Sequence, residues 1–125
     1  MKLIIMQYYR KDIFISELTK DADKVICYIY KEYLERRKSG MSKSEAKRFK
    51  MDFYQNIKVL SKWSDDDVSD TLRELHSKEF IKREISGSFS LLDSAITYME
   101  NRFKKGLSEV MDFISSLPSI PFPGI

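Results

Sequence analysis

A short amphipathic helix that leads directly into a β-hairpin most constrains how this chain can fold. Apolar residues recur there with the period of one helix face, and Ser64 is a suitable N-cap in front of them. The stretch 84–92, EISGSFSLL, then contains a Ser86-Gly87 pair typical of a two-residue turn, with residue 85 opposite residue 88. Because each element has one apolar face, the sequence predicts that both faces are buried in a shared core. The predicted core residues are Val68, Leu72 and Leu75 in the helix, and Ile81, Ile85, Phe89 and Leu91 around the hairpin.

Two further amphipathic helices are predicted before this unit. The first starts near Ala22 and ends near Ser39-Gly40. A run of cations just before this end would interact favourably with the negative end of the helix dipole. The second begins at Ser42, where a Ser-x-x-Glu capping box can satisfy two backbone amides, and is expected to reach about Leu60. The opening residues 1–21 are rich in β-branched and aromatic side chains, so we expect a lead-in that is either a strand or irregular.

Residues 93–117 have a heptad pattern. Their apolar residues are spaced alternately by three and four, as in a coiled-coil seam, and Gly106 is the one exception. We therefore expect one long helix that pairs two subunits of a homodimer. The alternative is two shorter helices, joined at Gly106, that pack on their own domain. The tail 118–125 contains three prolines, which exclude a helix, and its apolar residues are expected to lie against the domain or a partner. The predicted dimer-interface residues are Ile96, Met99, Phe103, Val110, Phe113 and Leu117.

Three helices, a two-stranded hairpin and a further helix occur in this order in winged helix-turn-helix proteins. The segments 68–82 and 89–100 resemble the leucine–leucine–glycine–large–isoleucine run, the wing and the last helix of small bacterial and phage members of that superfamily. The long final helix is similar to the PadR-like layout, in which it pairs two subunits. The resemblance implies an α+β, mainly α fold with a winged helix-turn-helix domain at residues 22–92. The sequence departs from the pattern at Glu79, where a glycine is common, and at Leu92, where a threonine would cap the last helix.

Composition argues against several classes of function. The chain of 125 residues has one histidine, one cysteine and no glycine-rich phosphate loop, so suitable side chains for a catalytic triad or a metal centre are too few. The single cysteine, Cys27, excludes an internal disulfide and suits a reducing cytoplasm. The longest apolar run, residues 25–30, is too short to span a bilayer. We therefore expect a cytoplasmic protein that is not an enzyme and binds no cofactor or metal.

The charges are segregated, although the net charge is only +3. Residues 20–62 carry twelve Lys/Arg and six Asp/Glu, whereas residues 64–79 carry two Lys/Arg and six Asp/Glu. In the winged-helix mode the third helix meets the bases, and aspartates there would repel phosphates. The resemblance implies double-stranded DNA as the partner, bound in an atypical orientation through cations elsewhere. The candidate nucleic-acid-binding residues are Lys43, Lys47, Arg48, Lys50, Arg73, Lys82 and Arg83.

The alternative function is a protein-interaction module on the same scaffold. The acidic third helix would then face a basic surface of another protein, such as a nucleic-acid-binding region, and the module would act as an adaptor or an antagonist. Helix capping and the helix dipole also explain carboxylates at this position. The candidate protein-interaction residues are Asp65, Asp66, Asp67, Asp70 and Glu74.

Overall fold

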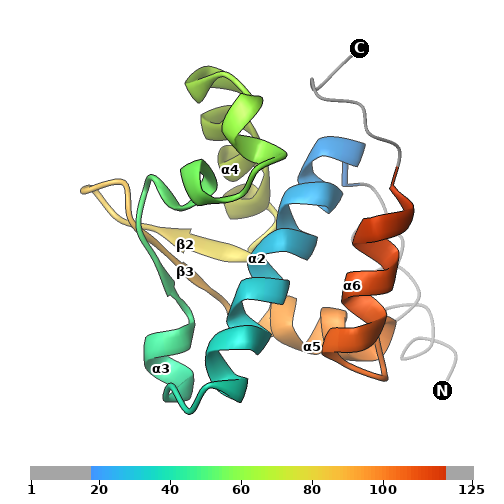
Figure 1. The fold of residues 1–125 in the computed structure, drawn as a ribbon. Coiled ribbons are helices and arrows are strands. Elements are labelled where there is room, and N and C mark those ends of the chain that lie inside the picture. The colour runs from blue at the N-terminus through green and yellow to red at the C-terminus, as the bar shows by residue number, and fades with distance from the viewer. Residues whose placement is uncertain (1–17, 118–125) are drawn as a thin grey trace, which may run out of the picture.

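The computed structural model describes residues 18–117 and shows a mainly helical fold with one small sheet (Figure 1). The α+β, mainly α class predicted from the sequence is confirmed. The expectations for the lead-in before residue 18 and for the proline-rich tail after residue 117 lie outside the described residues. The helices are α2 (Lys20–Lys38), α3 (Lys43–Ala46), α4 (Asp65–Ser77), α5 (Asp93–Arg102) and α6 (Leu107–Ser116). The strands are β1 (Arg48–Phe49), β2 (Ile81–Arg83) and β3 (Phe89–Leu91), and two 3-10 turns, η1 (Phe53–Asn56) and η2 (Leu60–Lys62), lie between β1 and α4.

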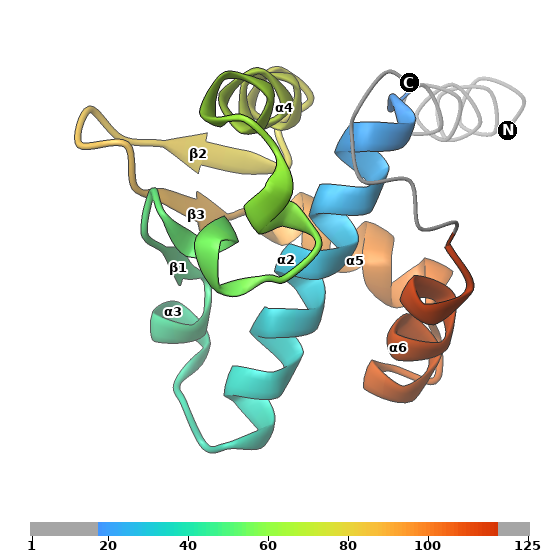
Figure 2. The same cartoon turned by 45° about the horizontal axis from the view of Figure 1, so that its top comes forward.

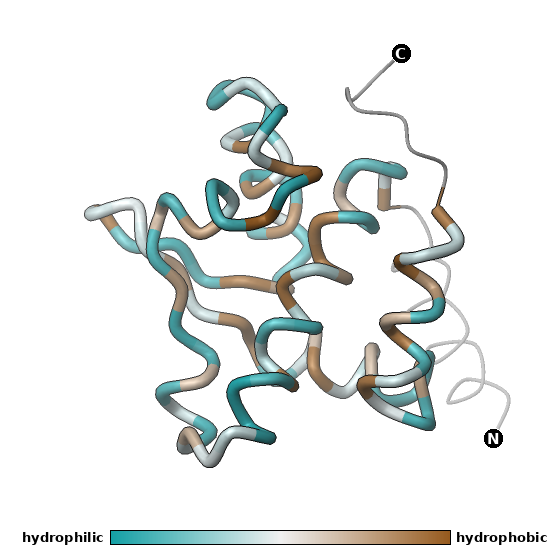
Figure 3. Tube along the Cα trace, viewed as in Figure 1, coloured by the Kyte–Doolittle hydropathy of each residue, from teal (hydrophilic) through white to brown (hydrophobic). Residues whose placement is uncertain are grey.

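Helix α2 runs through the middle of the molecule, and the other elements pack around it (Figure 2). The hydroxyl of its N-cap, Thr19, accepts a hydrogen bond from the Ala22 N–H at 3.2 Å. The aspartates in its first turn interact favourably with the positive end of the helix dipole. Figure 3 shows hydrophobic segments concentrated along α2 and along the elements beside it. The buried residues of α2 are Ala22, Val25, Ile26, Cys27, Ile29, Tyr30 and Tyr33.

Helices α2 and α4 end with the same backbone motif. At the end of α4, the Phe80 N–H donates to the Leu75 carbonyl at 2.9 Å and the Glu79 N–H donates to the His76 carbonyl at 3.0 Å. This pair of bonds is a Schellman motif, whose C′ residue is left-handed, and Glu79 there has φ +62°. At the end of α2, Gly40 fills the same place with φ +101°. A glutamate therefore occupies a backbone conformation that favours glycine.

The three strands form an antiparallel sheet in the order β1-β3-β2. The predicted hairpin is present, but its predicted two-residue turn is wrong. The Glu84 N–H donates to the Ser88 carbonyl at 2.8 Å and the Gly87 N–H donates to the Glu84 carbonyl at 2.9 Å, which leaves a three-residue loop, 85–87. The pairing is thus shifted by one residue from the prediction. Because of this shift, Ile85 is exposed at the hairpin tip instead of lying on the buried face.

The second predicted helix is wrong beyond its first turn. Ser42 caps α3 as expected, but α3 ends at Ala46 and β1 follows almost at once. The reason is a tertiary contact, since Phe49 stacks on Phe89 of β3 with ring centroids 5.2 Å apart. The apolar spacing of residues 46–60 fits one face of a helix, yet these residues reach the core from a strand and two 3-10 turns.

The long C-terminal helix of the prediction is two helices, α5 and α6, and the two-helix alternative is confirmed. The chain turns between them at Gly106, which has φ +77° and precedes α6. Helix α6 folds back onto α2 (Figure 1). The predicted single continuous helix is therefore wrong, and its central apolar residues lie inside the core of their own chain. Ile96, Met99, Phe103 and Val110 are buried, and Phe113 and Leu117 are half-buried.

Candidate nucleic-acid interface

The solvent-facing side of the sheet carries cations. Directly opposed residues of an antiparallel sheet project to the same face. The observed register places Arg48, Ser90 and Lys82 in one row across the three strands. Arg48 and Lys82 are exposed. Since neighbouring strands lie about 4.8 Å apart, the backbones that carry these two cations are separated by roughly 10 Å.

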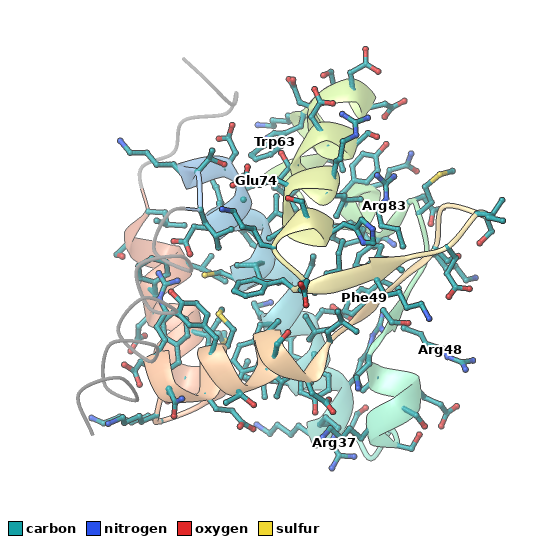
Figure 4. All side chains as sticks on the ribbon, turned by 180° about the vertical axis from the view of Figure 1, so that it is seen from behind. Arg37, Arg48, Phe49, Trp63, Glu74 and Arg83 are labelled. Atoms are coloured by element: carbon teal, nitrogen blue, oxygen red, sulfur yellow. The ribbon has the colours of Figure 1, made fainter. Side chains whose placement is uncertain are left out.

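The opposite face of the sheet is apolar and fixes the position of β1. Phe49 and Phe89 are buried there, with an angle of 6° between their ring planes. The guanidinium of Arg36, on α2, lies 4.3 Å from the centroid of the Phe49 ring and donates to the Arg48 carbonyl at 2.5 Å. Helix α2 therefore anchors the backbone of β1, and the Arg48 side chain extends away from the ribbon (Figure 4).

Two further cations lie beside this row. Lys50 follows β1 and is exposed, whereas Arg83 is half-buried on the side of β2 that faces α4 (Figure 4). Within residues 18–117, none of these four cations forms an ion pair. Their positive charge is therefore not neutralised inside the described part of the chain and can act on an anionic ligand. We call Arg48, Lys50, Lys82 and Arg83 the sheet cations.

The other two predicted cations of this region, Lys43 and Lys47, share one carboxylate. The Nζ atom of Lys47 donates to Asp93 Oδ1 at 2.8 Å, and that of Lys43 lies 3.7 Å from the same oxygen. The hydrogen bond from Lys47 lowers the pKa of Asp93. Because Asp93 offsets part of their charge, Lys43 and Lys47 contribute less to an anion-binding surface than the sheet cations.

Helix α4 offers no comparable cation on its exposed side. Its only arginine, Arg73, pairs with Asp70 three residues earlier at 2.8 Å. Asp66 is exposed beside the N-terminus of the helix, and Asp65, also exposed, accepts a hydrogen bond from the Tyr54 hydroxyl. The exposed start of α4 is therefore acidic, as the sequence predicted.

Two of the predicted protein-interaction residues, Asp67 and Glu74, are half-buried. The carboxylate of Glu74 accepts hydrogen bonds from the Thr19 N–H at 2.8 Å and the Thr19 hydroxyl at 2.7 Å, so it fixes the start of α2 against α4. Both carboxylates lie near Asp21 of α2, whose pKa is raised by burial and by the charges of Asp67 and Glu74. Glu74 therefore serves the fold, and the exposed acidic surface consists of Asp65, Asp66 and Asp70.

A shallow hollow lies beside α2. It has a volume of about 280 Å³, lies between α2 and residues 56–59 and is open to solvent. Its charged lining residues are Lys31, Glu32 and Lys58. No group of three or more histidine, cysteine or acidic side chains within residues 18–117 is arranged to hold a metal ion. In the same part of the chain, no helix combines the length and apolar character needed to cross a membrane.

Comparison of the chain with protein-family models, curated proteins and solved structures gives no significant match. The site must therefore be interpreted from its own geometry and charge.

Proposed function

We propose that this chain is a winged-helix protein that binds double-stranded DNA through the sheet cations, with α4 held away from the bases. The observation that carries the proposal is the contrast between the two surfaces. The sheet cations have no ion-pair partner within residues 18–117, whereas the one arginine of α4 is paired with Asp70. Neutralising phosphates and releasing their counterions drives most DNA binding, so the sheet is the more favourable surface.

The topology supports the winged-helix assignment. The order is α2, the short α3, β1, α4 and the hairpin of β2 and β3, and the first strand pairs with the last one. Glu79 also supports it, because its φ of +62° occurs at the position where the resemblance calls for glycine. The segment between β1 and α4 contains only the turns η1 and η2 in place of a second long helix.

The charges of α4 decide the orientation on DNA. In the usual winged-helix docking, the start of the third helix enters the major groove. Here that docking would bring Asp65, Asp66 and Asp70 close to phosphates, with Arg73 alone to compensate. Docking through the sheet avoids this repulsion and uses phosphate contacts, which hold a protein on DNA without reading its sequence.

The test is the salt dependence of binding to a random duplex, followed by fluorescence anisotropy over roughly 50 to 200 mM salt. Arg83 is opposite Phe89 and so projects to the other face of the sheet. Three phosphate contacts, from Arg48, Lys50 and Lys82, therefore predict that log K falls with log salt at a slope of about −2.7. Arg48→Gln and Lys82→Gln should each bring the slope closer to zero by about 0.9. Arg73→Gln is the matched control on α4 and should leave the slope unchanged. Absence of binding at low salt, or an equal effect of Arg73→Gln, would contradict the proposal.

A second candidate function rests on the exposed aspartates of α4. They form an acidic surface beside a helix N-terminus, which suits a basic partner protein. If the chain does not bind DNA but retains a lysine-rich peptide, and if Asp66→Asn together with Asp70→Asn weakens that retention, the protein-interaction function replaces the first proposal.

A further inference from the structure

The hairpin tip exposes two apolar side chains that the core does not use. Ile85 is fully exposed and the Met51 side chain is 58% exposed. They come from different segments, since Met51 follows β1 and Ile85 lies in the loop between β2 and β3. Figures 1 and 2 both show this loop projecting beyond the helices. Because burial of each exposed apolar side chain would be favourable, this projecting tip can gain free energy by inserting into a partner.

The backbone of the hairpin loop brings the Met51 side chain against Gly87, two residues after Ile85. Gly87 has φ +93°, as expected for the residue that closes a three-residue hairpin loop. The sulfur of Met51 lies 2.5 Å from the place where a Cβ atom on Gly87 would stand, so Met51 packs directly on the glycine backbone. Any larger residue at position 87 would displace it. The tip is thus an apolar projection with Ile85 in front and Met51 at its base.

We propose that the hairpin tip is a wedge that inserts Ile85 between base pairs of duplex DNA from the minor groove, with Met51 packed on Gly87 of the same loop. Architectural proteins kink DNA by inserting apolar side chains, among them isoleucine and methionine, into a base step. A patch of two side chains is far smaller than a stable protein interface, which buries at least about 1,000 Å². The size of the patch therefore favours a base step over a protein partner.

The charges around the wedge are those that such a ligand requires. Arg83 lies two residues before Ile85, and Lys50 directly precedes Met51. Glu84 and Asp52 are the acidic neighbours, and the four sheet cations outnumber them. Cations on both sides of an apolar projection can hold the two phosphate strands while the base step opens. The inference rests on the proposed function and adds where and how the duplex is deformed.

The proposed deformation predicts which DNA base steps are preferred. Opening a base step costs a few kcal/mol of stacking, and pyrimidine–purine steps such as TA and CA are the easiest to unstack. The wedge should therefore place itself at TA steps, even though the proposed phosphate contacts read no bases.

The experiment uses the full chain and a duplex of about 20 base pairs with 2-aminopurine in place of adenine at one TA step. Wild-type protein should raise the 2-aminopurine fluorescence, which reports loss of stacking. Ile85→Ser should abolish the rise and weaken binding to this duplex roughly tenfold, while the salt slope stays the same. Ile85→Leu is the matched control and should retain both properties. Since Ile85 is fully exposed, neither variant should change the circular dichroism spectrum or the unfolding midpoint.

The possible failures are distinguishable. Binding with the expected salt slope but no fluorescence rise would overturn the wedge and leave the proposed function standing. An equal fluorescence rise with Ile85→Ser would also overturn it. No binding to any duplex would overturn the wedge together with the proposed function. Gly87→Leu provides a second test, because it should displace Met51 and reduce the fluorescence rise without removing a cation.

Discussion

Arg102, the last residue of α5, joins the C-terminal half of the fold to Asp23 in the first turn of α2. Its two terminal nitrogens donate to the two carboxylate oxygens at 2.5 and 3.1 Å. The guanidinium also lies 4.9 Å from the ring centroid of Phe103 and 4.7 Å from that of Phe113. One side chain at the end of α5 therefore contacts both α2 and α6.

Arg102→Ala should lower the free energy of unfolding by about 2 kcal/mol, because it removes a bidentate, partly buried ion pair and the ring contacts together. Urea denaturation followed by circular dichroism measures this change. Arg73→Ala breaks the ion pair with Asp70 and is the control, and its effect should stay below about 1 kcal/mol because both partners are well exposed. Equal effects of the two substitutions would show that Arg102 acts only as a surface charge.

Val110 in α6 should be required for stability and not for dimerisation. It is fully buried against the core, so Val110→Asp places a charge where no partner exists and should cost more than about 3 kcal/mol. The measurement is the thermal unfolding midpoint together with the mass from light scattering. Met111→Asp is the matched control, since Met111 is the next residue of α6 and is 44% exposed. The prediction would be contradicted if the wild type were a dimer and Val110→Asp were a folded, stable monomer.

The parts of the fold that the sequence predicted are those in which local signals and tertiary packing agree. Helices α2 and α4 have their caps and their apolar stripes where the sequence indicates them. The second predicted helix fails because Phe49 pairs with Phe89, forty residues later, and this contact outweighs the helical spacing. Gly106 was the visible sign of a bend, but the sequence does not indicate that α6 would return to α2.

The candidate site was predictable to a similar extent. The sheet cations follow from charge and position, but the pairing of Lys47 with Asp93 joins residues 46 apart. The contact of Thr19 with Glu74 spans 55 residues, so nothing local indicated that Glu74 serves the fold. The exposure of Ile85 depends on a one-residue shift at the turn, which composition does not determine.

Glu79→Gly should raise the free energy of unfolding by about 1 kcal/mol. A left-handed residue other than glycine costs roughly 1–2 kcal/mol, and the greater freedom of glycine in the unfolded chain offsets part of that gain. The same motif at the end of α2 already has Gly40, so the replacement makes the two ends alike. Denaturant unfolding gives the value.

Glu79→Ala separates the backbone effect from loss of the side chain. Alanine keeps the left-handed strain, so this control should not stabilise the protein. If Glu79→Ala stabilised it as much as Glu79→Gly, the glutamate side chain would be the cause and the φ of +62° would not matter.

The pKa of Asp21 makes stability depend on pH in a defined direction. Burial, and then the charges of Asp67 and Glu74, raise this pKa in the folded protein above its ordinary value of 3.8. The folded state then binds the proton more tightly than the unfolded state, so Asp21 destabilises the fold once the pH exceeds its folded pKa. This penalty disappears as the pH falls through that pKa towards 3.8.

Asp21→Asn should therefore be more stable than wild type at neutral pH, and the difference should shrink as the medium is acidified. Unfolding midpoints measured at several pH values test both statements. Asp66→Asn removes an exposed carboxylate from α4 and controls for the change in net charge. A difference between Asp21→Asn and wild type that grew on acidification would have the wrong sign for this mechanism.

Cys27 should be inert towards thiol reagents in the folded protein. Its side chain is fully buried in α2, and burial, followed by the charge of Asp23, raises the pKa of the thiol to about 12. The thiolate is the reactive species, so at neutral pH both access and ionisation oppose the reaction. Labelling with an excess of a thiol reagent should then proceed only as fast as the chain unfolds, and it should be immediate in concentrated urea. Arg102→Ala should accelerate labelling in proportion to its loss of stability, whereas fast labelling of the wild type would mean that α2 opens locally.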